Sequence, residues 1–216
     1  MDNTEDEARI LRQDLETTFK KRNIPLDQRE ALNKLLESMR NYHLPTHNHM
    51  VRVGLIADKV EPLALVNTNS LLYPALTHDI GKLRIRLELL NKTNGWTEQD
   101  SDEMRYHALY GFEILRNKFL YSAYSAAYSH IFNLTKVFYL PPFPPNFSEA
   151  VKVAIMHSAR IVSIIDSRDA AVTRANDRNN QGNPRSLTRE GALDMLMKEC
   201  PDKKELIEKL VEQGIF

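Results

Sequence analysis

Apolar residues recur at helical spacing along most of the chain, and the alternation typical of β-strands is hard to find. Residues 3–22 show the pattern clearly, with apolar side chains at Ile10, Leu11, Leu15 and Phe19. One face of a helix there would be apolar and the other polar, which predicts an amphipathic helix packed on a core.

The same reading predicts helices over most of the remaining sequence. Their expected ranges are 24–43, 45–63, 67–81, 97–120, 147–175, 186–199 and 203–216. Several boundaries carry residues that favour helix ends, such as Pro25 in a first turn, Gly81 at an end and Thr97 before an acidic turn. The fold class expected is all-α, a helical bundle.

Two segments interrupt this pattern. Residues 138–150 read "FYLPPFPPNFSEA", and four of the five residues from 141 to 145 are proline, which excludes a helix and predicts a stiff loop. Residues 175–186 are polar and rich in turn-forming residues, so we expect a second loop there.

Composition narrows the class of protein. Lys plus Arg and Asp plus Glu both total 29, so the formal net charge is zero and no nucleic acid is required as a partner. Cys200 is the only cysteine, which rules out an intrachain disulfide or a cysteine-rich zinc site. The acidic N-terminus lacks an apolar signal core and no apolar run would span a membrane, so we expect a cytoplasmic protein.

We expect two parts in the chain. Residues 1–44 are expected to be an N-terminal helical extension, and residues 45–216 the main domain. Whether the protein forms a homodimer is left open.

Candidate chemistry lies in histidines and aspartates on apolar helix faces. His49 lies near the buried stripe of its helix, and His78 and Asp79 end an apolar helix. His107 has apolar neighbours at helical spacing, and Asp166 follows two isoleucines. A buried carboxylate is costly unless it meets a cation or strong donors. A metal site in the bundle core satisfies all these groups at once, whereas separate hydrogen-bonded side chains would need a separate explanation for each.

Four segments in order resemble the HD-domain metal-dependent phosphohydrolases, and among them most closely the HD-GYP phosphodiesterases. They are "HMVRV" from His49, "ALTHDIGKLRI" from Ala75, "LLNKTNGWTEQDSDEMRYHALYGFEIL" from Leu89 and "SARIVSIIDSRDAAVT" from Ser158. The resemblance runs from about residue 48 to residue 199 with a gap. A lone His-Asp pair is a weak signal, but four segments in the right order are a strong one.

The chain departs from the HD-GYP branch in two places. The double histidine and the Gly-Tyr-Pro signature are missing, and residues 124–150 supply only His130 and the proline-rich stretch. The Arg-Pro-Tyr expected after the last-aspartate helix is replaced by "TRANDRN" from Thr173. We therefore expect a rebuilt pocket, with little activity on cyclic di-GMP.

The resemblance implies a role for each matching position. One divalent ion would be held by His49, His78, Asp79 and Asp166. Asp79 would bridge to a second ion, held also by His107 and His130. Lys82 and Arg52 would contact a phosphorylated, nucleotide-like substrate, and Asp79 and Lys82 would be the catalytic residues. The ions would be Fe, Mn, Ni, Co or Zn.

Alternatives remain at this stage. The HD scaffold also hosts di-iron oxygenases, and a degenerate domain could bind a nucleotide without cleaving it. Taken alone, Lys82 would be a lysine at a helix end, and Trp96 a turn anchor. Tyr121, Tyr124 and Tyr128 are expected to pack in the core. The aromatic residues of 138–150 either cover the core or cover the metal site.

Overall fold

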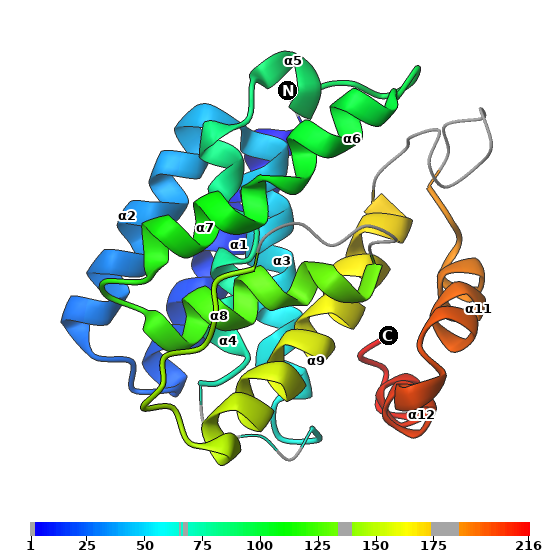
Figure 1. The fold of residues 1–216 in the computed structure, drawn as a ribbon. Helices are drawn as coiled ribbons and strands as arrows, with labels where there is room; N and C mark the ends of the chain where they lie inside the picture. The colour runs from blue at the N-terminus through cyan, green and yellow to red at the C-terminus, as the bar shows by residue number, and fades with distance from the viewer. Residues whose placement is uncertain (1–2, 65, 67–68, 134–139, 174–185) are drawn as a thin grey trace.

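The computed structural model describes residues 3–64, 66, 69–133, 140–173 and 186–216, and these residues form a bundle of helices without strands (Figure 1). The all-α prediction is therefore confirmed. None of the described helices is long and apolar enough to cross a membrane. In chain order the α-helices and 3-10 helices (η) are α1 (Asn3–Lys21), α2 (Leu26–Tyr42), α3 (Leu44–Val60), α4 (Leu72–Thr77), η1 (Ile80–Arg84), α5 (Leu87–Leu90), α6 (Glu98–Arg105), α7 (His107–Leu115), α8 (Leu120–Ser129), η2 (His130–Asn133), α9 (Glu149–Thr173), α11 (Arg189–Glu199), η3 (Pro201–Lys203) and α12 (Lys204–Glu212).

The first two helices share a hydrophobic core with the helices that follow. Leu15 and Phe19 of α1 and Leu36 of α2 lie in one buried cluster with Met50 of α3. Each of these side chains is almost fully removed from water, which stabilises the packing of α1 and α2 on α3 by burial of apolar surface. The assignment of residues 1–44 to a separate extension stays a prediction.

The helix expected to reach Gly81 ends earlier. α4 stops at Thr77, His78 and Asp79 form a turn, and η1 follows. Gly81 does not have the positive φ of a glycine that caps a helix, so the prediction that it ends the helix is wrong. The glycine is needed for packing instead, because a β-carbon at residue 81 would lie 1.8 Å from the carbonyl oxygen of His107.

The single helix expected over residues 97–120 is divided. Thr97 caps α6 as predicted, and it forms a capping box with Asp100. The chain then bends at Tyr106, and His107 begins α7. The bend places His107 at a helix start, beside η1.

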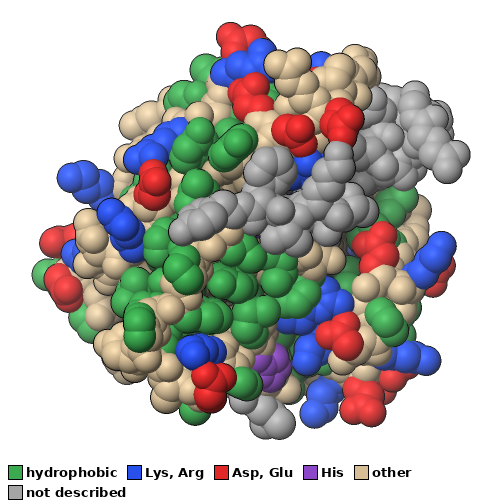
Figure 2. All heavy atoms as spheres, viewed as in Figure 1, with side chains coloured by type: hydrophobic (Ala, Val, Ile, Leu, Met, Phe, Trp, Pro, Cys, Tyr) green, Lys and Arg blue, Asp and Glu red, His purple; other side chains and the backbone are tan. Residues whose placement is uncertain are grey.

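Aromatic residues of the proline-rich segment pack against α8. Phe143 stacks on Tyr128 with ring centroids 5.0 Å apart, and Phe147 meets the edge of Tyr124. The hydroxyls of Tyr124 and Tyr128 donate to proline carbonyls of the segment, so the packing role predicted for these tyrosines is confirmed. Figure 2 shows hydrophobic side chains gathered over this region of the surface. The aromatic residues expected at 138 and 139 lie outside the described residues.

The long helix α9 joins the bundle to the C-terminal helices. On one side, Ile161 and Ile165 pack with Val53 and Ala57 of α3, which aligns α9 with the helix that carries His49. On the other side, Ile164 packs with residues of α11 and α12. The polar loop expected at residues 175–186 lies almost wholly outside the described part of the chain.

Candidate metal centre

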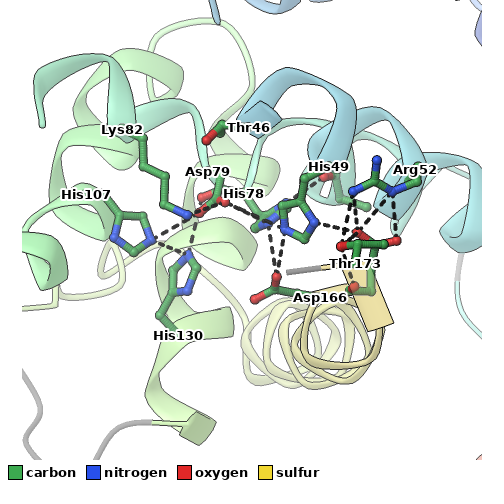
Figure 3. Close-up of polar contacts among 12 residues, drawn as sticks. Thr46, His49, Arg52, His78, Asp79, Lys82, His107, His130, Asp166 and Thr173 are labelled. Atoms are coloured by element: carbon green, nitrogen blue, oxygen red, sulfur yellow. Dashed lines mark hydrogen bonds and ion pairs between the residues drawn. The ribbon is translucent and has the colours of Figure 1, made fainter. Parts of the chain in front are cut away.

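All the side chains predicted to bind metal meet inside the bundle (Figure 3). They come from separate elements: His49 from α3, His78 and Asp79 from the turn after α4, His107 from the start of α7, His130 from the start of η2 and Asp166 from α9. Adjacent residues on a helix point in directions about 100° apart, so they converge poorly on one ion. The turn at His78 and Asp79 removes this restriction, because Asp79 has φ −100° and ψ 6°, outside the helical region.

The first group contains His49, His78, Asp79 and Asp166. The Nε2 atom of His49 lies 2.9 Å from an oxygen of Asp166 and 3.7 Å from Oδ2 of Asp79. The Nε2 atom of His78 lies 3.5 Å from the same Asp79 oxygen and 3.6 Å from Asp166. His49, His78 and Asp79 are buried, so the group is enclosed except near Asp166, whose side chain is 18% exposed.

The second group contains Asp79, His107 and His130. The Nε2 atom of His107 lies 3.3 Å from Oδ1 of Asp79 and 3.0 Å from Nε2 of His130. Asp79 is thus shared, with Oδ2 toward the first group and Oδ1 toward the second. The structure thus brings His107 and His130 together beside Asp79, and the assignment of these side chains as metal ligands stays a prediction.

The geometry of these groups fits metal binding. Ligand atoms that share one ion at bond lengths of about 2.0–2.2 Å lie roughly 3.0–3.5 Å apart, close to the separations observed here. Three imidazoles hydrogen-bond through Nδ1 to an acceptor. The acceptor is Asp169 for His49, the Ala75 carbonyl for His78 and the Met104 carbonyl for His107. Each therefore turns Nε2 toward the group, and Nε2 of His78 is buried without a hydrogen-bond partner. A buried polar atom of this kind is costly unless a ligand occupies the space beside it.

The family model for the HD domain matches residues 46–171, more than half of the chain. The chain belongs to the HD domain family. Comparisons with curated proteins and with solved structures gave no match. The matched HD domain begins in α3 and ends in α9, so it contains both ligand groups and leaves α1, α2, α11 and α12 outside.

Burial opposes charge throughout this HD-domain centre, and the pKa shifts show which neighbours outweigh it. Burial lowers the pKa of His78, but the carboxylates of Asp79 and Asp166 outweigh burial and raise it to about 10. Burial raises the pKa of Asp79, but Lys82 and His78 hold it well below its usual range. At His107, by contrast, burial prevails and, together with His130, lowers the pKa well below its usual value. The carboxylates are therefore ionised and the His107 imidazole is neutral, as metal ligands need, whereas His78 carries a proton that a bound metal would displace.

Lys82 connects the metal centre to a cavity. Its ammonium lies 2.5 Å from Oδ2 of Asp79, and the side chain is buried. A cavity of about 590 Å³ opens beside it, lined also by Arg52, Lys92, Trp96 and Met104. The two residues predicted to contact substrate, Lys82 and Arg52, are thus both at this cavity. Trp96 anchors a turn as expected, since its Nε1 donates to the Lys92 carbonyl, but it also lines the cavity.

Sequence reasoning missed Asp169. Its side chain is buried and accepts a hydrogen bond from Nδ1 of His49 at 2.7 Å. Asp169 lies three residues after Asp166, so both carboxylates project from the same face of α9. That spacing is the feature of the sequence from which a second carboxylate beside Asp166 could have been predicted.

The histidines outside the two groups have ordinary roles. His43 caps α3 by accepting a hydrogen bond from the Thr46 amide. The ring of His47 is buried and contacts the side chain of Asn48. His157 lies partly exposed on α9, and burial lowers its pKa.

Proposed function

We propose that this HD-domain protein is a metal-dependent phosphohydrolase that cleaves a phosphoester of a small, nucleotide-like molecule. The observation that carries the proposal is the position of Asp79, whose two oxygens face different histidine groups. A carboxylate in this position can be shared by two cations. When bound, divalent ions lower the pKa of a coordinated water and stabilise negative charge on a reacting phosphate.

The protein's own residues support the same reaction. Lys82 places a positive charge where the metal centre meets the cavity, the position from which it can contact a phosphate oxygen. Burial of His49, His78, Asp79 and His107 keeps bulk water away from these side chains, which strengthens electrostatic interactions within the centre. These features favour hydrolysis at phosphorus over a purely structural metal site, which would not need a lysine at its open side.

The cavity also suits a nucleotide-like substrate. Trp96 offers an aromatic surface, Met104 an adaptable apolar one, and Lys92 a charge that is paired with Asp100 at 2.6 Å. A volume of about 590 Å³ is in the range of small-molecule sites. Within the family we place the protein nearest the HD-GYP branch, on the motifs around His49, His78 and Asp166.

We expect poor turnover of cyclic di-GMP. The branch's Gly-Tyr-Pro signature is replaced here, and Phe143 and Phe147 of the replacing segment pack on α8 instead of on the metal centre. This packing favours the view that the segment covers the core. The substrate pocket is then bounded by the loop that carries Trp96.

Two competing functions would give different experimental results. A di-iron oxygenase would consume oxygen and depend on iron, and a degenerate sensor would bind nucleotides without releasing product. Lys82 favours hydrolysis over oxygenation, because an ammonium beside the shared carboxylate complements phosphate. Both ligand groups are intact, which favours catalysis over sensing.

The test is a substrate screen on the purified protein with its metal content determined by elemental analysis. Phosphomonoesters, phosphodiesters and cyclic dinucleotides are assayed with Mn, Fe, Ni or Co, and oxygen uptake is followed in parallel. Asp79→Ala should lose both bound metal and phosphate release, because it removes the shared ligand. Asp14→Ala, at an exposed position on α1, is the matched control and should match the wild type. Full metal content and full turnover in Asp79→Ala would contradict the proposal.

A further inference from the structure

A chain of polar contacts leads from His49 to the N-terminal helix. Asp169 of α9 accepts from Nδ1 of His49, and it also accepts from Arg52, with Nε donating to Oδ1 at 3.0 Å and Nη2 to Oδ2 at 3.0 Å. Arg52 in turn donates from Nη1 to Glu7 of α1 at 2.6 Å. The chain thus crosses three helices, α3, α9 and α1, before it reaches solvent.

Glu7 is held at both of its oxygens by residues that flank His49. Oε1 accepts from Arg52, and Oε2 accepts from the amide of Asn48 at 3.0 Å. Asn48 is buried, and its amide also donates to the Thr4 carbonyl of α1. One carboxylate of α1 therefore contacts α3 immediately before and one turn after the metal-binding histidine.

The contacts of Arg52 indicate what this network does. Its guanidinium already donates to Asp169, Thr173 and Glu7, so its planar donor set serves side chains of the protein. Glu7 offsets the charge of Arg52 on the side away from Asp169. Asp169 can then accept from His49 and Arg52 together without moving toward either.

This arrangement fixes both the orientation and the tautomer of His49. A carboxylate at Asp169 requires the proton on Nδ1, which leaves Nε2 for a ligand. His49 is fully buried and Asp169 is 2% exposed, so solvent does not replace this bond. Any change that turns Asp169 also turns the His49 ring in the ligand group.

We propose that Glu7 is a positioning residue of the metal centre, acting through Arg52 and Asp169 on His49. The N-terminal helix α1 lies outside the matched HD domain, yet through Glu7 it helps to orient a side chain of the metal centre. This inference rests on the proposed metal site, and it concerns how tightly and in what geometry that site holds an ion.

The test compares Glu7→Gln, Asp169→Asn and the double variant with Glu5→Gln as the control. Glu5 lies on the same helix, is exposed, and contacts only Arg40 among the described pairs, at 3.0 Å. Divalent-metal affinity is measured by competition with a chromophoric chelator, and the visible absorption of the Co²⁺ form reports the ligand geometry. Thermal unfolding of the metal-free protein separates loss of folding from loss of positioning.

We expect Asp169→Asn to weaken metal binding about 10–100-fold, as is typical when a partner of a metal-binding histidine is lost. Whichever way the new amide turns, either His49 or Arg52 loses an acceptor. Glu7→Gln keeps its shape at a half-exposed position and should fold, with affinity reduced by roughly the lower end of that range and a shifted Co²⁺ spectrum. The two changes should not be additive, because Glu7 acts through Asp169.

Two results would overturn the inference. One is a Glu7→Gln protein that matches Glu5→Gln in affinity and spectrum, and the other is a Glu7→Gln effect that persists in full in the Asp169→Asn background. Either result leaves the metal centre itself intact, since the wild type still binds ions. A wild-type protein that takes up no divalent ion would instead overturn the proposed function, and this inference with it.

Discussion

Gly81 of η1 lies directly against the backbone of His107, the residue that begins α7. A β-carbon on residue 81 would meet the His107 carbonyl oxygen at 1.8 Å and the Gly111 amide nitrogen at 2.4 Å. The backbones that carry Asp79 and His107 are therefore as close as they are only because residue 81 has no side chain.

Gly81→Ala should separate η1 from α7 and weaken the second ligand group. Backbone atoms cannot yield as a flexible side chain can, so we expect a loss of about 1–3 kcal/mol or more in the free energy of unfolding. Urea denaturation measures this loss, and elemental analysis measures the metal retained. Gly191→Ala is the control, because its β-carbon would meet only ordinary contacts at 3.5 Å and beyond. Wild-type stability and metal content in Gly81→Ala would show that the contact is not needed.

His107→Ala should separate the two ligand groups. His107 contacts only the Oδ1 side of Asp79, while His49, His78 and Asp166 meet on the other side. The variant should therefore lose about one metal equivalent per chain and keep the other. Elemental analysis after desalting gives the stoichiometry, with His157→Ala as the histidine control on α9. Two retained equivalents would reduce His107 to a core histidine.

Local sequence pattern was sufficient for most of the fold and for the burial of several candidate ligands. His49 lies on an apolar helix face, and His78 and Asp79 end an apolar helix, so their burial could be predicted from spacing alone. The helix start at Thr97 could be predicted for the same reason, since a threonine before an acidic turn is a local signal.

Contacts between distant segments were not visible in the sequence. Glu7 meets Arg52 across 45 positions, and Gly81 meets His107 through backbone packing that no side-chain pattern records. The split at Tyr106 likewise depends on tertiary packing, because the apolar periodicity continues through the bend. Asp169 could be predicted in part. Its spacing from Asp166 was a local signal, but its hydrogen bond to His49 joins two distant segments and was not visible in the sequence.

Phe143→Ala should affect stability and leave substrate binding unchanged. Phe143 stacks on Tyr128 and contacts Tyr124 with centroids 5.1 Å apart, and it is absent from the cavity beside Lys82. For this partly buried ring we expect a loss of about 1–3 kcal/mol, below the range for fully buried phenylalanines. Thermal unfolding measures the loss, and Val153→Ala, at a position 64% exposed, is the control. A raised KM with unchanged stability would show that the proline-rich segment contacts substrate.

Lys82→Met should separate substrate chemistry from metal binding. Methionine keeps the buried stem of the lysine but removes the ammonium that lies 2.5 Å from Asp79. Asp79 remains in place, so metal content should equal that of the wild type. Turnover of the best phosphoester from the screen should fall roughly 100-fold, because a charge aimed at the developing negative charge is lost. Steady-state kinetics and elemental analysis on one preparation measure both quantities, and Lys59→Ala, at an exposed position on α3, controls for loss of a lysine. Unchanged kinetics would mean that Lys82 only neutralises Asp79, whereas loss of metal would mean that it supports the ligand group itself.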